Sequence, residues 1–301
     1  MNDVARAAGV SLKTVSRVVN GEPTVAPALA ARVHAAVASL HYRPHLAAGL
    51  LRRNDRRTGT IGLLLDDQVP AALHRAIDDE ARTRGVRVLA ARVPPGSGPG
   101  PPALLDGLII AAGGADTRSF PDIPAVLVER RGTVDAVLAT GAAGSRDAVR
   151  HLIARGHRHI AYLGEVASDR HRGYLAALGA AGLIAHVVRN PASAEHATLA
   201  LLDGPSPPTA LFTAQSPITI GAFRALRRRG AHGRVALVGF DDFPLADLLE
   251  PAVTVVDADP ARMGHTAVRA LFERIDGLAV PPREFWIPAI LIPRGSGEIP
   301  P

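Results

Sequence analysis

Apolar positions near the N-terminus recur at the spacing of short amphipathic helices. The pattern predicts one helix over residues 3–8, a second from the N-cap candidate Ser11 to about Val19, and a third from Pro27 to about Leu40. Gly9 suits the left-handed conformation that ends a helix. The apolar faces of the first and third helices consist of Val4, Ala5, Ala8, Leu29, Val33, Val37 and Leu40. We therefore expect a small all-α module at this end of the chain.

From Thr60 onward the pattern changes to short apolar runs, several of them followed by an amphipathic stretch. The strand-like runs are 61–65, 86–91, 108–111, 125–128, 159–163, 210–213, 235–238 and 253–256. The helix-like stretches are 73–84, 144–155, 172–181, 218–229 and 261–275. Strands that alternate with helices are typical of a doubly wound parallel sheet, and the number of units predicts an α/β core of two such subdomains.

One stretch interrupts this alternation. Between Ala91 and Leu108 the sequence RVPPGSGPGPPALLDG is dominated by proline and glycine. Proline removes a helical hydrogen bond and clashes with the preceding turn, so no full helix is expected there. We interpret its glycines as part of a linker.

The excess positive charge of the chain lies in its first 57 residues. The formal net charge is +6, and residues 1–57 contain nine basic and three acidic residues, whereas the rest of the chain contains 25 of each. A small basic module on a neutral body is the electrostatic pattern of a nucleic-acid-binding protein. Charge alone leaves open a basic tail that only increases solubility.

Composition excludes several other classes of protein. The chain has no cysteine, which removes disulfides and thiolate zinc sites and suits a reducing compartment. The first residues lack the apolar core of a signal peptide, and no run of about 18 uncharged apolar residues predicts a membrane span. His157 and His159 would share one strand face without a third metal ligand, and no nucleophile elbow or phosphate loop is present. We therefore expect a cytoplasmic protein that is not an enzyme and has no metal, cofactor or membrane contact.

The strongest motif is DVARAAGVSLKTVSRVVNG, residues 3–21. A helix-turn-helix requires a small residue in the first helix where the second crosses it, a glycine in the turn, and an apolar residue of the second helix that faces the first. Ala5, Gly9 and Val15 meet these requirements. The residues that would then point outward, toward a major groove, are Leu12, Lys13, Thr14, Ser16 and Arg17. The alternative is an ordinary helical hairpin with polar residues facing solvent.

This motif and the segments after it resemble the LacI family of transcription regulators. The resemblance continues through Val25 and residues 31–33, 40–44 and 50–52. In the core it is carried, in family order, by residues 60–63, 105–110, 151–153, 156–160, 170–174, 208–212, 238–242 and 244–246. It therefore covers nearly the whole chain. It implies a helix-turn-helix headpiece on a core similar to periplasmic sugar-binding proteins, in a regulator that represses from a palindromic DNA operator as a homodimer.

The resemblance also implies a role for each DNA-facing position. Base reading is implied for Leu12, Lys13 and Arg17, phosphate contact for Ser11, Thr14, Ser16 and Asn20, and minor-groove contact by a hinge helix for Leu51. His45 and Gly49 stand where the hinge usually has asparagine and arginine. Because glycine costs a helix interior about 1 kcal/mol, we expect weaker hinge folding. The chain begins at Met1 without the usual threonine cap, so we expect the natural start upstream.

In the core, the resemblance implies a small-molecule effector, a sugar or related metabolite, held between the subdomains by Arg170, Asp241 and Ser216. The alternatives are that Arg170 is an ordinary surface arginine and that Asp241 only caps a helix. Other family positions have changed: Gln215-Ser216 replaces Asn-Asp, Thr140-Gly141 replaces Asp-Asn, and residues 67–70 contain no aromatic. These changes argue against a standard free monosaccharide.

We predict three parts along the chain. Residues 1–44 form the headpiece, 45–58 the hinge helix and linker, and 59–295 the sensing and dimerisation core. The first subdomain comprises about 59–141 and 256–278, and the second about 142–255 and 279–295. Because the chain ends without leucine heptads, we expect a dimer rather than a tetramer. Two alternatives stay open: a DNA-binding regulator whose core has lost small-molecule sensing, and a solute-binding protein.

Overall fold

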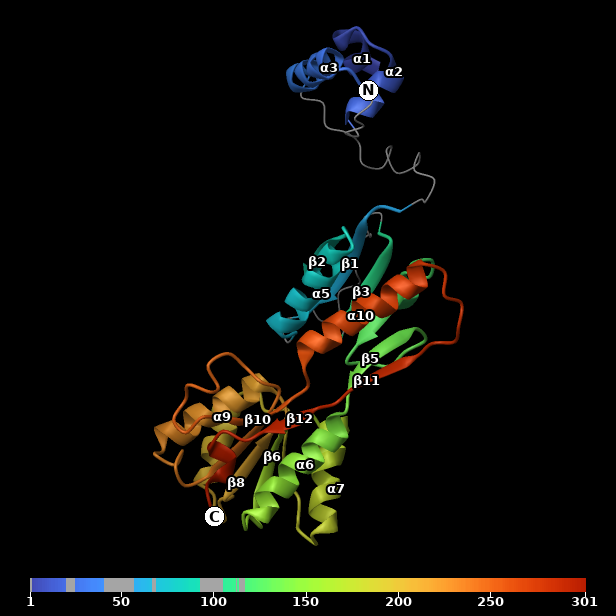
Figure 1. The fold of residues 1–301 in the computed structure, drawn as a ribbon. Coiled ribbons are helices and arrows are strands. Elements are labelled where there is room, and N and C mark those ends of the chain that lie inside the picture. Colours follow the sequence, from blue (N-terminus) through green and yellow to red (C-terminus); the bar gives the residue numbers. More distant parts are fainter. Residues whose placement is uncertain are drawn as a thin grey trace. The chain divides into compact units, whose positions relative to one another are not determined.

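The computed structural model describes residues 2–19, 25–40, 57–66, 69–92, 105–111, 113 and 117–301. The chain divides into two compact units, Met1–Thr60 with Pro101–Asp106 and Ile61–Gly100 with Gly107–Pro301. Figure 1 shows helices in the first unit and a mixture of strands and helices in the second. The predicted fold class, an all-α headpiece and an α/β core, is confirmed.

The headpiece consists of α1 (Asn2–Ala8), α2 (Leu12–Val19) and α3 (Pro27–Ser39). Its core is formed by one apolar face from each helix: Val4, Ala8, Val15, Val18, Val33 and Ala36. Leu40, expected in this core, follows the end of α3 and is 46% exposed. Ala36 lies three residues after Val33 and takes that place, because the helix ends before Leu40 can return to the same face.

The first sheet of the core contains β1 (Thr60–Leu65), β2 (Arg87–Arg92), β3 (Gly107–Ile110), β4 (Ala125–Val128), β5 (Asp135–Ala139) and β11 (Glu284–Ile287), in the order β11-β5-β4-β3-β1-β2. The pairs β1–β3, β3–β4, β4–β5 and β5–β11 are parallel. Two helices, α5 (Ala71–Thr83) and α10 (Pro260–Ile275), pack on one face of this sheet through residues such as Ile77 and Leu271 (Figure 1).

The second sheet contains β6 (Ile160–Gly164), β7 (His186–Arg189), β8 (Ala210–Thr213), β9 (Ala236–Phe240), β10 (Thr254–Asp257) and β12 (Ile290–Ile292), in the order β12-β10-β9-β8-β6-β7. One face is covered by α6 (Gly141–Ala154) and α7 (Asp169–Ala180), the other by α8 (Ala194–Leu202) and α9 (Ser216–Arg228). Strand β12 pairs antiparallel with β10, and the pairs β10–β9, β9–β8, β8–β6 and β6–β7 are parallel.

Several elements differ from the sequence-based expectation. Residues 279–295 were expected in the second subdomain, yet β11 pairs in parallel with β5 of the first sheet. Backbone hydrogen bonds to β5 make β11 the edge strand of the first sheet. The chain returns to the second sheet only with β12, which pairs with β10. Helix α8 and strands β5, β7, β11 and β12 were not predicted. Helix α8 has little amphipathic periodicity. The proline-rich residues 93–104 lie outside the described residues.

A buried carboxylate joins three segments of the first subdomain. The side chain of Asp135, at the start of β5, has no exposed surface and accepts hydrogen bonds from Arg274 of α10 and from Arg283, which precedes β11. Burial alone would raise the pKa of Asp135, but the hydrogen bonds from both guanidinium groups outweigh it and lower the pKa. This cluster fixes the end of α10 to the strands that lead toward the second subdomain.

Candidate functional site

The turn between α1 and α2 has the backbone geometry of a helix-turn-helix. Gly9 has φ of +58°, a left-handed conformation that disfavours a side chain. The Arg32 side chain of α3 donates to the carbonyl oxygens of Ala8 at 2.7 Å and Gly9 at 3.3 Å. These bonds satisfy carbonyl groups at the end of α1 and hold α3 against the turn. A Cβ atom on Gly9 would lie 2.6 Å from an Arg32 nitrogen.

Helix α2 has one buried and one exposed face. Ser11 is its N-cap, as predicted, since its Oγ accepts from the Thr14 amide at 3.1 Å. Val15 and Val18 are 0% and 7% exposed in the headpiece core. Leu12 is 39% exposed and Lys13 is exposed, so an apolar and a cationic side chain lie together on the outer surface.

The remaining predicted DNA-contact residues lie as follows. Thr14 and Arg17 are half-buried, and the Thr14 hydroxyl is 2.9 Å from the Ser11 hydroxyl. The backbone of Ser16 belongs to α2. The Ser16 side chain and the whole of Asn20 and Leu51 are outside the described residues.

The second site lies in the core, where cavities of about 520 and 460 Å³ are lined by residues of both sheets. We call the two cavities together the cleft. Its walls include Asp66 after β1, Glu165 after β6 and Gln215 after β8. Both sheets reverse their strand order at these positions, between β1 and β3 and between β6 and β8. Ligands of open α/β sheets bind at the carboxyl ends of the strands beside this reversal.

Arg170 and Asp241, predicted as the effector-binding pair, meet in this cleft. Arg170 lies in the first turn of α7 and donates to both Asp241 carboxylate oxygens at 2.8 and 3.1 Å. It also donates to the Ala214 carbonyl oxygen at 2.5 Å, and its guanidinium group lies 4.1 Å from the centre of the Phe240 ring. Burial raises the pKa of Asp241, and Arg170 opposes that shift. Ser216, the third predicted contact, lines the 460 Å³ cavity.

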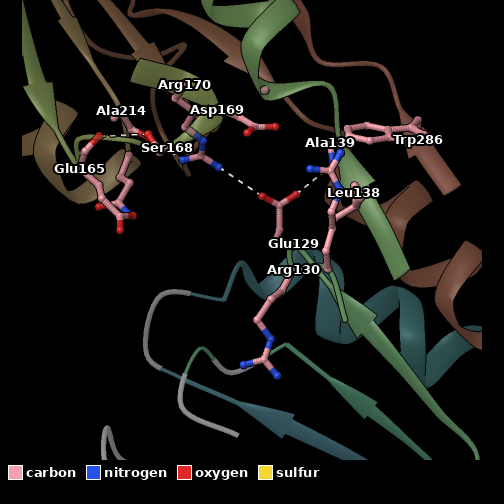
Figure 2. Close-up of a pocket in the computed structure, with 13 residues that line it drawn as sticks. Glu129, Arg130, Leu138, Ala139, Glu165, Ser168, Asp169, Arg170, Ala214 and Trp286 are labelled. Atoms are coloured by element: carbon pink, nitrogen blue, oxygen red, sulfur yellow. Dashed lines mark hydrogen bonds and ion pairs between the residues drawn. The ribbon is translucent and has the colours of Figure 1, made fainter. Parts of the chain in front are cut away.

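Glu129 is a cleft residue that the sequence analysis missed. It follows β4 with φ of +60°, and its side chain reaches Arg170 at 3.5 Å and accepts from the Ala139 amide at 3.3 Å. Figure 2 shows the Glu129 carboxylate between Arg170 and Ala139, and the Arg130 side chain points away from it. The surrounding protein raises the pKa of Glu129 by desolvation, which Arg170 partly offsets. No local pattern marks this residue, because its partner lies 41 positions further along the chain.

Trp286 of β11 was also missed. It lines the 520 Å³ cavity with 42% of its surface exposed. Residues 67–70, after the first strand, contain no aromatic residue, and the fold brings Trp286 to the cleft from a strand near the C-terminus.

The two histidines considered as metal ligands have other partners. Both precede β6 rather than lying on it. His157 is buried between the Thr209 hydroxyl and the Ile299 carbonyl oxygen, at 2.9 and 2.8 Å, and His159 faces His186 at 3.3 Å. Within the described ranges, no three His, Cys, Asp or Glu side chains are grouped to hold a metal ion. Nor does any helix in those ranges have the length and hydropathy to cross a bilayer.

Comparison with known proteins places both sites in one family. Residues 1–45 match the model of bacterial regulatory proteins of the lacI family, and residues 149–297 match a periplasmic binding protein-like domain. The chain is 29% identical to the ribose operon repressor of Escherichia coli, over 98% of this chain and 99% of that protein. It is 30% identical to the HTH-type transcriptional repressor PurR of Erwinia tasmaniensis, over 91% of this chain and 90% of that protein.

The fold is similar to a solved structure of a Lac repressor dimer bound to operator and the anti-inducer ONPF. The TM-score is 0.76 and the identity 26%, over 98% of each chain. The relatives are transcriptional repressors and not enzymes. The chain belongs to the LacI family of bacterial transcription regulators, with a DNA-binding helix-turn-helix and a periplasmic-binding-protein-like sensor core.

Proposed function

We propose that the chain binds a palindromic operator as a homodimer, with α2 of each headpiece in a major groove. The observation that carries this proposal is the two-faced character of α2: Val15 and Val18 are buried, while Leu12 and Lys13 are exposed. A helix held by one apolar face presents the other as a rigid surface for base edges. The similarity to an operator-bound repressor dimer supports the same arrangement.

Each predicted DNA-facing residue has a role in this proposal. Leu12, Lys13 and Arg17 read bases, since a guanidinium group matches the acceptors of guanine. Phosphate contacts come from Ser11, Thr14, Ser16 and Asn20, and Leu51 of a hinge helix over residues 44–52 enters the minor groove. The basic headpiece supplies charge for phosphate neutralisation.

The cleft is the proposed control site, where a small-molecule effector contacts Arg170, Asp241 and Ser216 and changes operator affinity. The pair has the polar groups for hydroxyl recognition, and the cavity volumes are within the range of about 300–1,000 Å³ common for ligand sites. One observation favours the alternative of a regulator without small-molecule sensing. Both terminal nitrogens of Arg170 are already engaged, by Asp241, Ala214 and Glu129.

The experiment is a salt titration of operator affinity on a selected palindromic site, with a scrambled duplex of equal length as control. A dimer with roughly 6–10 phosphate contacts should lose about 10³–10⁵ in affinity between about 50 and 200 mM salt. Light scattering at micromolar protein should give the mass of a dimer. An affinity that is flat with salt, or equal affinity for the scrambled duplex, would contradict the proposal.

A further inference from the structure

The turn between α1 and α2 is held by a side chain of the third helix. The amide of Val10 donates back to the Ala5 carbonyl oxygen at 3.1 Å, which closes the end of α1. The carbonyl oxygens of Ala8 and Gly9 accept from Arg32 Nη2, at 2.7 and 3.3 Å. Arg32 lies 24 and 23 positions further along the chain, in α3. Two carbonyl groups of the turn therefore depend on α3 rather than on the turn itself.

The place of the Arg32 guanidinium group depends on the absence of a side chain at Gly9. A Cβ atom there would lie 2.6 Å from Arg32 Nη2, closer than a Cβ atom approaches another heavy atom in proteins. Within the part of the chain that the structure describes, Arg32 pairs with no carboxylate and donates to these two carbonyl oxygens. Gly9 thus permits the left-handed turn and also leaves the space in which Arg32 binds it.

The turn sets the direction in which α2 begins. Only Val10 and Ser11 separate Gly9 from the first residue of α2. The inner face of α2 packs on the headpiece core through apolar side chains. Apolar packing is non-directional, whereas a hydrogen bond requires a defined distance and angle. The directional constraints on α2 therefore come from the Ser11 cap and from the turn that Arg32 holds.

We propose that Arg32 is a positioning residue for base reading: its bonds to the turn fix the orientation of α2, and it contacts no base itself. The base contacts proposed for Lys13 and Arg17 form only when donor and acceptor meet at hydrogen-bond distance and angle. A small rotation of α2 weakens these contacts more than it weakens phosphate contacts, which carry no sequence information. Loss of Arg32 therefore reduces the discrimination between operator and random DNA. This inference rests on the proposed function of α2 as the reading helix.

The test compares Arg32→Met and Arg32→Lys with wild type in the full chain, on the selected operator and on a scrambled duplex of equal length. Methionine keeps an unbranched side chain without a donor, whereas lysine keeps the charge and an ammonium donor. Arg32→Met should weaken operator binding by about tenfold or more, and binding to the scrambled duplex by less than about threefold. Arg32→Lys should recover part of the operator affinity.

Arg6→Met is the matched control, since it removes the same charge from an exposed side chain of α1. It should change either affinity by less than about threefold. Hydrogen exchange should show equal protection of the α2 amides in Arg32→Met and wild type. Loss of that protection in both Arg32 variants would mean that Arg32 holds the fold of the headpiece, and would overturn the positioning role.

Binding-site selection and salt dependence separate positioning from direct contact with DNA. Arg32→Met should select the wild-type half-site with a weaker preference, and its salt slope should equal that of Arg6→Met. A different half-site would assign Arg32 to a base, and equal losses on both duplexes with a slope lower by about 1 would assign it to a phosphate. Either result, or an unchanged ratio of operator to scrambled affinity, overturns the inference. A wild type that binds both duplexes equally contradicts the proposed function, and the inference falls with it.

Discussion

The headpiece and the cleft are built in opposite ways. In the headpiece, the outer face of α2 comes from eight consecutive residues, and its orientation follows from Val15 and Val18 on the inner face. In the cleft, the interacting groups come from positions as distant as Glu129, Arg170, Asp241 and Trp286. The first site depends on local helix periodicity, and the second on the order of strands in two sheets.

The difference shows which interactions each site depends on. A change that disrupts the small apolar core of the headpiece should remove DNA binding and leave the α/β core folded, since the chain divides into separate compact units. A change in the polar clusters of the core should first affect stability of that unit. The following predictions test this separation, in order of decreasing effect.

Val15→Asp should abolish specific operator binding. Val15 is fully buried in the headpiece core, and an unpaired charge there costs several kcal/mol, on the order of the stability of so small a module. Operator affinity should fall about 10³-fold or more, to the nonspecific level. The main calorimetric transition, which comes from the larger unit, should keep its Tm. Loss of that transition as well would contradict the separation. His34→Ala, at an exposed position of α3 that is not among the proposed DNA contacts, is the control.

Asp135→Asn should destabilise the core by about 3–5 kcal/mol, because it removes a buried charge from two guanidinium partners. The free energy of unfolding from urea titration measures this loss. Asp122→Asn, on an exposed carboxylate, serves as control. A loss below about 1 kcal/mol, which is typical of exposed ion pairs, would contradict a stabilising role for the buried Asp135 carboxylate.

Arg17→Ala should weaken the operator complex by about 1–3 kcal/mol relative to random DNA, as expected for loss of a bidentate base contact. Arg6→Ala on α1 removes the same charge from an exposed pair with Asp3 and is the matched control. Anisotropy titrations on operator and random duplexes measure both. Equal losses on the two duplexes would assign Arg17 to phosphate rather than base contact.

Acid should narrow the stability difference between wild type and Asp135→Asn. The pKa of Asp135 is lowered in the folded chain, so its contribution is fully present above its unfolded pKa of about 3.9. That contribution is lost as the pH falls through the lower folded value. Tm values measured from pH 7 to pH 2 should therefore converge in the acid range. The difference should begin to fall as the pH approaches about 3.9, where the unfolded chain takes up the proton, and should continue to fall to pH 2. A difference that stays constant from pH 7 to pH 2 would contradict the lowered pKa.

Much of this architecture could be predicted because its signals are local. The cap at Ser11, the left-handed Gly9 and the buried face of α2 follow from adjacent residues, and the eight predicted strands and five predicted helices of the core all correspond to elements of the structure. The pairing of Arg170 with Asp241 followed from family resemblance rather than from periodicity.

The rest could not be predicted because it depends on strand order. The assignment of β11 to the first sheet requires its register with β5, which no local pattern encodes. Trp286 lies on β11, so its position in the cleft depends on the same strand pairing. Glu129 adopts a left-handed backbone at the end of β4, a conformation that the sequence Val-Glu-Arg does not indicate.

The most direct test of base reading by α2 is a binding-site selection with wild type and a Leu12→Ala/Lys13→Ala double variant. Both residues are on the exposed face of α2, so the variant should fold like wild type. Wild type should select a palindrome with one preferred half-site, and the double variant a palindrome whose half-sites differ at the bases those side chains contact. If both proteins select the same half-site, the exposed face of α2 does not read the operator.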